Sequence, residues 1–291
     1  MTEKRTLLAV FAHPDDESFG PGGTLARYAA QGVNVHLICA TGGEAGMVDK
    51  ASLLASGSNP ADVRLAELRC AAGQLGLSGV HLLGYRDSGM AGSPDNDHPD
   101  CLAQADPHQV AARVTGYIRE LRPQVVITFD PMGGYKHPDH IAMHRAAVAA
   151  FHAAGDPAAY PGQLAEGLAT HAPHKLYYTS IPRRALRWMV RIMPLLGRDP
   201  TALGQNGDIN LVDIAAVDYP ITARIDVADY LEVKDAAAAC HRSQGGHDRR
   251  LLGWLPRWLV RRIASTEGFT RAYPEAKPGE PIEKNLFAGV A

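Results

Sequence analysis

The sequence predicts an α/β fold: a Rossmann-like, mostly parallel sheet with helices on both faces, followed by a less regular C-terminal part. In the first 155 of 291 residues, short apolar runs alternate with alanine-rich stretches. The apolar runs are continuous, as is typical of parallel strands that are buried on both faces. Hydrophobic residues make up 46% of the chain and charged residues 21%, which is enough apolar material for a sizeable core.

The elements of this first half follow from strand-like runs and from helix end signals. Pro60 suits the first turn of a helix, and Gly32, Gly76 and Gly155 each suit the position just past a helix end. We therefore expect strands over 7–12, 33–40, 80–84 and 124–129, and helices over 24–31, 60–75, 107–121 and 140–154.

The second half is less regular. It predicts strands over 176–180 and 221–227 and a helix over 230–242. Residues 271–291 are rich in proline, glycine and charge, so we expect an irregular tail over the surface. The organisation predicted is a catalytic α/β core with a metal site in residues 1–180. An α+β extension in 181–291 would complete the same domain and cover the cleft.

Two segments, 183–193 and 249–262, combine arginine, tryptophan and aliphatic residues at helical spacing. The favoured interpretation is a pair of amphipathic helices that pack over the catalytic domain or form an oligomer contact. The alternative is a patch that contacts a membrane surface, where the enzyme would reach a lipid-linked glycan.

Charge and cysteine usage restrict the class of protein. A formal net charge of -2 and a pI of about 6.7 give no reason to expect a nucleic-acid partner. We find no signal peptide and no apolar run long enough to span a membrane. The cysteines are scattered without a C-x-x-C pair, which indicates reduced thiols and a cytoplasmic protein. They are Cys39, Cys70, Cys101 and Cys240.

The residues that can carry chemistry gather in two segments. Residues 12–17 (AHPDDE) follow the first expected strand, and residues 130–140 (DPMGGYKHPDH) follow the fourth. The carboxyl ends of parallel strands lie at one edge of the sheet, where α/β proteins form their sites. Both segments are therefore expected to face one cleft.

A catalytic zinc site needs about three protein ligands and a position left for water. His13, Asp16 and His140 would supply a His₂Asp set, and the zinc would acidify water and polarise a carbonyl. Asp15 would then act as general base on the water, and His137 would protonate a leaving amine or stabilise an oxyanion. This chemistry is that of a metal-dependent amidohydrolase.

Tyr135, in a Gly-Gly-Tyr turn, could direct its hydroxyl toward the same oxyanion. Either segment alone has a structural interpretation, as a helix cap or a strand-ending turn. The coincidence of two His/Asp clusters, each after an expected strand, favours the catalytic interpretation. By contrast, residues 20–23 (GPGG) lack the G-x-G-x-x-G pattern of a dinucleotide fold, and residues 98–100 (HPD) suit a solvated turn.

With AHPDDE and HPDH both present, the chain resembles the LmbE/PIG-L family of zinc-dependent de-N-acetylases. Within the family it is most similar to the mycothiol-pathway members, the N-acetylglucosaminyl-inositol deacetylase and the related conjugate amidase. Residues 86–92 (RDSGMAG), 133–135 (GGY) and 241–244 (HRSQ), and Arg64 followed by Glu67, carry this further likeness.

The resemblance implies the same metal ligands, base and oxyanion residues as above. It also implies that Asp139 contacts the metal ligands and not the metal, and that Arg64 and Asp87 face the sugar hydroxyls. Glu44 and His241 are further candidates for substrate contact. The implied cofactor is Zn²⁺, with Fe²⁺ as the alternative. The implied substrate is a small amino-sugar conjugate, and the implied assembly is a homo-oligomer.

One residue departs from the mycothiol subgroup. Met47 follows the Gly43–Gly46 turn at a position where the subgroup carries an acid, and methionine is only a weak acceptor. The alternatives left open are therefore an amidase on thiol conjugates or a deacetylase that tailors natural products. Two other classes remain, a non-catalytic metal- or sugar-binding module and a nucleotide-binding regulator.

Overall fold

The computed structural model describes residues 4–46, 59–180, 183–203, 209–217, 219–245 and 257–290. These form one seven-stranded sheet of order β3-β2-β1-β4-β5-β7-β6, parallel from β3 to β5 and antiparallel at β7 and β6. The strands are β1 (Thr6–Phe11), β2 (Asn34–Thr41), β3 (Gly79–Tyr85), β4 (Val125–Thr128), β5 (Lys175–Ser180), β6 (Ala223–Asp226) and β7 (Thr266–Tyr273).

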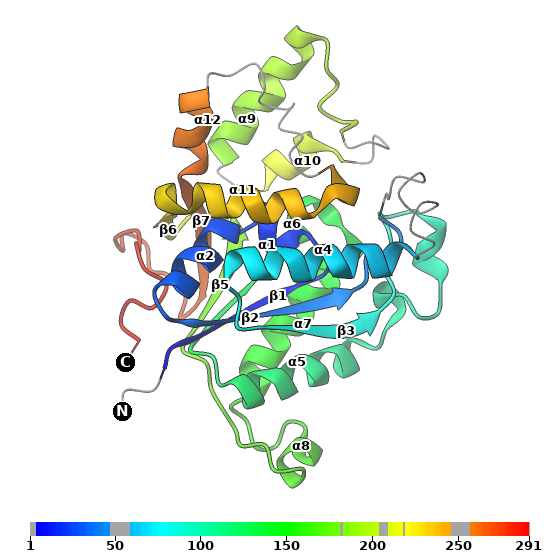
Figure 1. Cartoon of the computed structure of the whole chain (residues 1–291), viewed down its shortest axis with the longest axis vertical. Helices are drawn as coiled ribbons and strands as arrows, with labels where there is room; N and C mark the ends of the chain where they lie inside the picture. Colours follow the sequence, from blue (N-terminus) through cyan, green and yellow to red (C-terminus); the bar gives the residue numbers. More distant parts are fainter. Residues whose placement is uncertain are drawn as a thin grey trace.

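Helices cover both faces of the sheet, so the predicted fold class is confirmed (Figure 1). Helices α2, α4 and α11 pack together on one face, and α5 packs with α7 on the other. Their bounds are α2 (Gly22–Ala30), α4 (Pro60–Leu75), α5 (Pro107–Leu121), α7 (Pro138–Ala153) and α11 (Leu231–Cys240). Three shorter helices lie in the connecting segments of the chain. They are α1 (Asp16–Phe19), α6 (Gly133–Lys136) and α8 (Pro161–Ala165).

The central strands form the core because their side chains are apolar on both faces. All six residues of β1 and all four of β4 are buried. Helix α4 begins and ends where the sequence predicts: Asn59 accepts a hydrogen bond from the Asp62 amide, and Gly76 takes a left-handed conformation at φ 71°. Because β1 and β4 pair in parallel, their carboxyl ends lie side by side, and the loops that follow them carry the expected site.

The second half adds β6 and β7 to the same sheet, next to β5. Strand β7 was not expected, and it overlaps the start of the predicted tail. The tail is also wrong as a purely surface segment, because Leu286, Phe287 and Val290 are buried in the main core. Phe287 packs against Tyr28 of α2, and this apolar contact draws the chain end back onto the molecule. The division of the chain at residue 180 stays a prediction.

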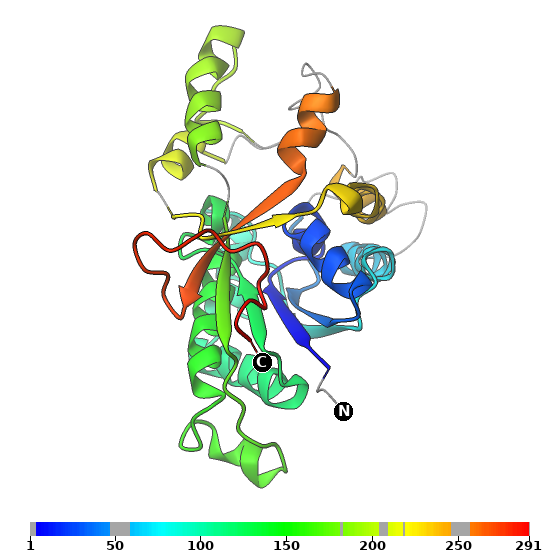
Figure 2. The ribbon, with the colours of Figure 1, turned by 90° about the vertical axis from the view of Figure 1, so that its left-hand side faces the viewer.

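The first expected Arg/Trp helix corresponds to α9 (Arg183–Ile192). The end of the second corresponds to α12 (Arg257–Ala264), and residues 249–256 lie outside the described residues. Helix α9 packs on α10 (Leu211–Ala216), and α12 packs against β7. Both helices project from the same end of the molecule (Figures 1 and 2). In the part of the chain that the structure describes, no helix is long and apolar enough to cross a membrane.

The expectation of four reduced thiols is wrong for one pair. Cys70 of α4 and Cys240 of α11 form a disulfide across 170 residues of sequence, with their Cα atoms 5.9 Å apart. Cys39 and Cys101 are free and buried. The pairing follows from the packing of α4 on α11, which brings two distant cysteines within bonding geometry. The argument from cysteine usage for a reducing compartment therefore does not hold for this pair.

Candidate metal centre and active site

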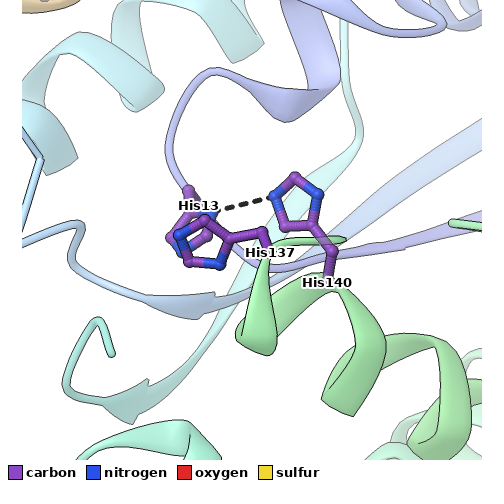
Figure 3. A group of neighbouring side chains, drawn as sticks. All are labelled: His13, His137 and His140. Atoms are coloured by element: carbon purple, nitrogen blue, oxygen red, sulfur yellow. Dashed lines mark hydrogen bonds between the residues drawn. The ribbon is translucent and has the colours of Figure 1, made fainter. Parts of the chain in front are cut away.

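Two loops at the carboxyl edge of the sheet bring three histidines together. His13 follows β1, and His137 and His140 lie at the start of α7, after β4 (Figure 3). All three are buried, and one ring nitrogen from each lies within 4.8 Å of the others. The convergence expected from the strand order is therefore present in the structure.

His13, Asp16 and His140 could hold one metal ion, with the two oxygens of Asp16 each facing one histidine. Nδ1 of His13 lies 3.1 Å from Nε2 of His140 and 3.7 Å from Oδ2 of Asp16. Nε2 of His140 lies 3.4 Å from Oδ1 of Asp16. Tetrahedral zinc with bonds of about 2.0–2.2 Å separates its ligand atoms by about 3.4 Å. The donor types and their spacing thus fit a zinc ion.

The opposite nitrogen of His13 has different neighbours. Nε2 of His13 lies 3.1 Å from Oδ2 of Asp139 and 3.5 Å from Oδ1 of Asp87. Asp139 is fully buried and accepts hydrogen bonds from both the amide and the hydroxyl of Ser88. A carboxylate held in this way fixes the orientation of a ligating imidazole, as in other metal sites. Ser88 lies in the RDSGMAG segment, but its contact with Asp139 was not foreseen.

His140 is oriented from its own loop. Its Nδ1 lies 3.2 Å from the carbonyl oxygen of Gly133, which leaves Nε2 directed at His13 and Asp16. Gly133 adopts φ 66°, and a Cβ atom there would lie 2.9 Å from Cβ of His140. Only glycine satisfies both conditions, which explains the Gly-Gly-Tyr turn. The Asp130 carboxylate closes the turn by accepting hydrogen bonds from the amides of Met132 and Gly134.

Burial and neighbouring charges shift the pKa values of these groups in different directions. Burial alone would lower the pKa of His13, but Asp87, Asp139 and Asp16 together raise it well above the usual histidine value. Burial and the neighbouring His13 lower the pKa of His140 well below that value. Burial raises the pKa of Asp16 to about 6, against the opposing pull of His13. The cluster therefore holds both a neutral imidazole and ionisable oxygen donors.

Asp15 lies beside His13, Asp16 and His140 and is not one of the expected metal ligands. Its backbone adopts φ 131°, a conformation that is costly for a residue with a Cβ atom. Burial raises the pKa of Asp15 to about 7, although the Arg64 guanidinium, 3.2 Å from Oδ2, opposes this shift. A carboxylate with a pKa near neutrality is suited to accept a proton from water and release it later.

His137 and Tyr135 line the same space. Their ring centroids lie 5.9 Å apart, and the Tyr135 ring lies 5.0 Å from the ring of His140. Burial, together with His13 and His140, lowers the pKa of His137 to about 2, so the imidazole is neutral here. Of the two roles expected for His137, a neutral imidazole suits the stabilisation of an oxyanion and not the protonation of a leaving amine. Burial also raises the pKa of Tyr135 well above its usual value, which keeps the phenol protonated.

The residues expected to bind the sugar lie next to Asp15 and His13. Arg64 is buried and donates hydrogen bonds to the carbonyl oxygens of Gly43 and Pro14, at 2.8 Å each. Its Nη1 lies 3.8 Å from Oδ2 of Asp87. Glu44 accepts a hydrogen bond from the Asp87 amide at 2.9 Å. Among the described residues, no hydrogen-bond partner reaches Nε of Arg64. Met47, whose identity departs from the mycothiol subgroup, lies outside the described residues.

His241 lies behind the metal loop. It is fully buried, and its Nε2 lies 2.7 Å from Oε1 of Glu17. Glu17 in turn accepts a hydrogen bond from the Asp15 amide at 3.0 Å, so this pair supports the strained turn. Both residues lie in motifs that the sequence shows. Their contact was not predicted, because they are 224 positions apart in the sequence. Direct contact of His241 with substrate stays a prediction.

Comparison with known proteins identifies the family. The model of the PIG-L family, described as GlcNAc-PI de-N-acetylase, matches residues 8–151, which include both histidine loops. A protein of Catenulispora acidiphila is 39% identical over 99% of this chain and 98% of its own length. This chain belongs to the PIG-L family. The Catenulispora protein is named 1D-myo-inositol 2-acetamido-2-deoxy-alpha-D-glucopyranoside deacetylase 2.

A second PIG-L relative, from Geodermatophilus obscurus, is 37% identical over 100% of this chain and 99% of its own length. It is named as a deacetylase of the same inositol glucosaminide. The expectation of a deacetylase related to enzymes that act on an amino-sugar conjugate is thus confirmed at the level of the family. The sequence likeness also extends beyond the expected first half, to nearly the whole chain.

Solved structures of low identity share the fold. The N,N'-diacetylchitobiose deacetylase of Pyrococcus horikoshii aligns with a TM-score of 0.65 at 21% identity, over 95% of this chain and 88% of its own. The 4-carboxy-2-hydroxymuconate hydratase of Pseudomonas putida aligns with a TM-score of 0.59, also at 21% identity, over 95% of this chain and 99% of its own. One fold thus carries two kinds of reaction, so function is argued from the site and not from the PIG-L fold alone.

Proposed function

We propose that this protein is a metal-dependent deacetylase that hydrolyses the N-acetyl group of 1D-myo-inositol 2-acetamido-2-deoxy-α-D-glucopyranoside. The observation that carries the proposal is the His13, Asp16 and His140 donor set, which has the carboxylate of Asp15 beside it. The nearly full-length likeness to two deacetylases of that compound supports the choice of substrate.

The metal would be held by Nδ1 of His13, Nε2 of His140 and the carboxylate of Asp16. We favour zinc, because two imidazoles and one carboxylate make a common catalytic zinc set. Ferrous iron accepts the same ligands. When bound, the metal supplies Lewis acidity that polarises the amide carbonyl and lowers the pKa of a water molecule. His137 is left out of this set, although its distance from the other two histidines would allow it to be a ligand.

Asp15 would take the proton from the attacking water. Its raised pKa and its position beside Asp16 suit this role. Arg64 would hold the Asp15 carboxylate in place through the 3.2 Å contact. As the amide nitrogen leaves, Asp15 would return this proton to it, so that acetate and a free amine are released.

His137 and Tyr135 would stabilise the negative charge that develops on the amide oxygen. A neutral imidazole and a phenol are both hydrogen-bond donors, and buried donors of this kind act strongly because water does not compete. The low pKa of His137 favours this role over that of a charged acid.

Arg64, Asp87 and Glu44 would contact the sugar hydroxyls near the scissile amide. Arg64 and Asp87 are both buried beside Asp15 and His13, so a sugar that reaches them would leave water behind. Buried polar groups that are satisfied only by substrate reject analogues that lack the matching hydroxyl.

A second candidate is the deacetylation of a different amino-sugar conjugate. Met47 favours it, because a methionine offers an inositol ring no strong acceptor. Both candidates share the chemistry proposed above and differ only in the group attached to the sugar.

The test is amine release from a panel of N-acetylglucosamine derivatives by metal-stripped protein reloaded with zinc. The panel contains the free sugar and its inositol-linked, malate-linked, chitobiose and lipid-linked forms. We expect the highest kcat/KM for the inositol-linked form, and only with metal. A preference for another conjugate would establish the second candidate, and metal-loaded protein that releases no amine from any member would contradict the first.

A further inference from the structure

Two stretches of the chain differ from the rest in composition. Residues 181–200 and 246–265 contain ten of the 29 basic residues and only two of the 31 acidic residues. Their formal charge is therefore +8, whereas the remainder of the chain carries -10. The same two stretches contain all three tryptophans of the chain, Trp188, Trp254 and Trp258. Arginine and tryptophan together are typical of segments that lie at a membrane interface.

In the first stretch, α9 has an inner and an outer side. Leu186 and Met193 are buried, and Leu186 packs with Ile214 of α10. By contrast, the Trp188 side chain is 65% exposed and that of Leu195 is 84% exposed, and Arg191 is exposed as well. Trp188 and Arg191 are three residues apart on α9, so they share its outer side, and Leu195 lies in the turn that follows the helix.

The second stretch presents similar residues on α12. Ile263 is 52% exposed, Arg262 is exposed, and the Arg261 side chain is 57% exposed. The contact of Arg261 with Glu232 is long, at 3.8 Å, and both side chains are in solvent. Such pairs are weak and leave the guanidinium able to bind elsewhere.

The two helices project from the same end of the molecule, beyond the sheet (Figure 2). We define the Arg/Trp face as Trp188, Arg191, Leu195, Arg261, Arg262 and Ile263. Over the described residues, four of the seven large apolar side chains that are exposed lie on α9, α10, α12 and the turn after α9. They are Trp188, Leu195, Val212 and Ile263.

We propose that the Arg/Trp face binds the surface of an anionic lipid bilayer. Cations near such a surface are attracted by its negative potential, while tryptophan and aliphatic side chains enter the headgroup region. A symmetric contact between two copies through this face would bring both sets of arginines into one interface, so charge complementarity favours the lipid. The proposal is independent of the substrate, and it strengthens the membrane interpretation that was the alternative at the sequence level.

The face also adjoins the candidate site. The inner side of α9 packs toward Met132 and Tyr135, which lie in the loop that carries the histidines. A bilayer bound to α9 would therefore lie next to one wall of the site without using any residue of it.

The experiment is binding of the full-length protein to vesicles, followed by sedimentation and by tryptophan fluorescence. Because all three tryptophans lie in the two stretches, the fluorescence reports on these stretches alone. We expect binding and a blue-shifted emission with vesicles of phosphatidylglycerol and phosphatidylcholine in equal parts. Vesicles of phosphatidylcholine alone should bind far less. Raising NaCl from about 0.05 M to about 0.5 M should weaken the binding, because the attraction is screened.

The variants are Arg191→Glu and Trp188→Ala, with Lys277→Glu as the matched control on an exposed loop. Arg191→Glu reverses one charge on the face and should lower the vesicle partition coefficient by about thirty-fold. Lys277→Glu reverses one charge elsewhere and should leave this coefficient unchanged. Far-UV circular dichroism checks that each variant is folded, and deacetylation of a water-soluble substrate should be the same in all three.

Absence of binding to pure phosphatidylglycerol vesicles at low salt would overturn the proposal. So would sedimentation velocity showing a dimer that Arg191→Glu or Trp188→Ala converts to a monomer, if vesicles do not bind. In that case the face would be a contact between copies of the chain.

Discussion

At the residue scale, Asp15 is the group on which the proposed chemistry depends most. It combines a raised pKa of about 7, a contact with Arg64 and a backbone conformation that costs about 1–3 kcal/mol. The fold stabilises this conformation through Glu17, whose carboxylate binds the Asp15 amide. Local strain at a carboxylate next to a donor set indicates a residue positioned for reaction and not for stability.

Asp15→Asn should therefore lower kcat by about 10²- to 10⁴-fold, because an amide cannot accept the proton. Asparagine tolerates positive φ better than most residues, so the thermal midpoint should stay within a few degrees of wild type. Metal content should be unchanged, whereas the control Asp16→Asn should lose metal. Stopped assays measure kcat, and metal analysis of the same preparations measures the metal content. Full activity in Asp15→Asn would exclude Asp15 as the base.

Much of this site was predictable from the sequence. His13, Asp16, His137 and His140 follow strands whose carboxyl ends must meet at one edge of a parallel sheet, so their convergence follows from topology. The His241–Glu17 pair was not predictable in this way, because α11 packs against α1 through contacts that no local pattern encodes.

At the element scale, the helices and strands predicted correctly from the sequence were those with clear local signals in their residues. Helices α4 and α5 begin at Pro60 and Pro107, each after a side chain that caps the helix, and both have the expected bounds. Strand β7 was missed because its sequence, TEGFTRAY, has neither a continuous apolar run nor strict alternation. It forms because β5 and β6 offer edges to pair with, which is a tertiary cause.

The Cys70–Cys240 disulfide joins α4, which carries Arg64, to α11, which ends next to His241. Its closed loop is long, so replacing both cysteines by alanine should lower the free energy of unfolding by about 2–5 kcal/mol. A reductant should destabilise the wild type and leave the double variant unchanged. Denaturant titration measures this difference. Thiol titration of the unfolded, unreduced protein should find only Cys39 and Cys101. Four titratable thiols would show that the pair is not bonded.

Glu283 attaches the C-terminal segment to the sheet. It binds Lys175 of β5 at 2.7 Å and Arg271 of β7 at 2.6 Å, and it also binds the Tyr177 hydroxyl. Burial would raise the pKa of Glu283, but these partners outweigh it and lower the pKa below the usual value. A lowered pKa in the folded state means that the stabilisation is present above the unfolded-state pKa and is lost as the pH falls.

Glu283→Gln should therefore cost about 1.5–3 kcal/mol at pH 7. The difference from wild type should narrow as the pH falls from about 6 to about 3, because the wild-type carboxylate becomes protonated. Chemical denaturation at several pH values measures it. Glu280→Gln is the control, since Glu280 pairs with Arg271 at the surface and should contribute at most about 1 kcal/mol. A pH-independent difference would mean that the charge of Glu283 does not stabilise the fold.

At the scale of the whole molecule, one sheet unites both halves of the chain. The first half supplies the loops that carry the donor set, and the second half supplies β6, β7 and helix α11, which ends next to His241. The family likeness extends over the same length, which agrees with a site that depends on both halves. The arginine-rich helices at one end give the molecule a strong charge asymmetry that net charge alone conceals.

The central claim is that one metal ion, held by His13, Asp16 and His140, is required for deacetylation. The most direct measurement is a titration of metal-stripped protein with zinc, in which acetate release is followed at each addition. We predict that activity rises in proportion to added zinc, stops rising at one ion per chain, and is absent in His140→Ala. Full activity in protein shown by mass spectrometry to contain no metal would contradict the claim.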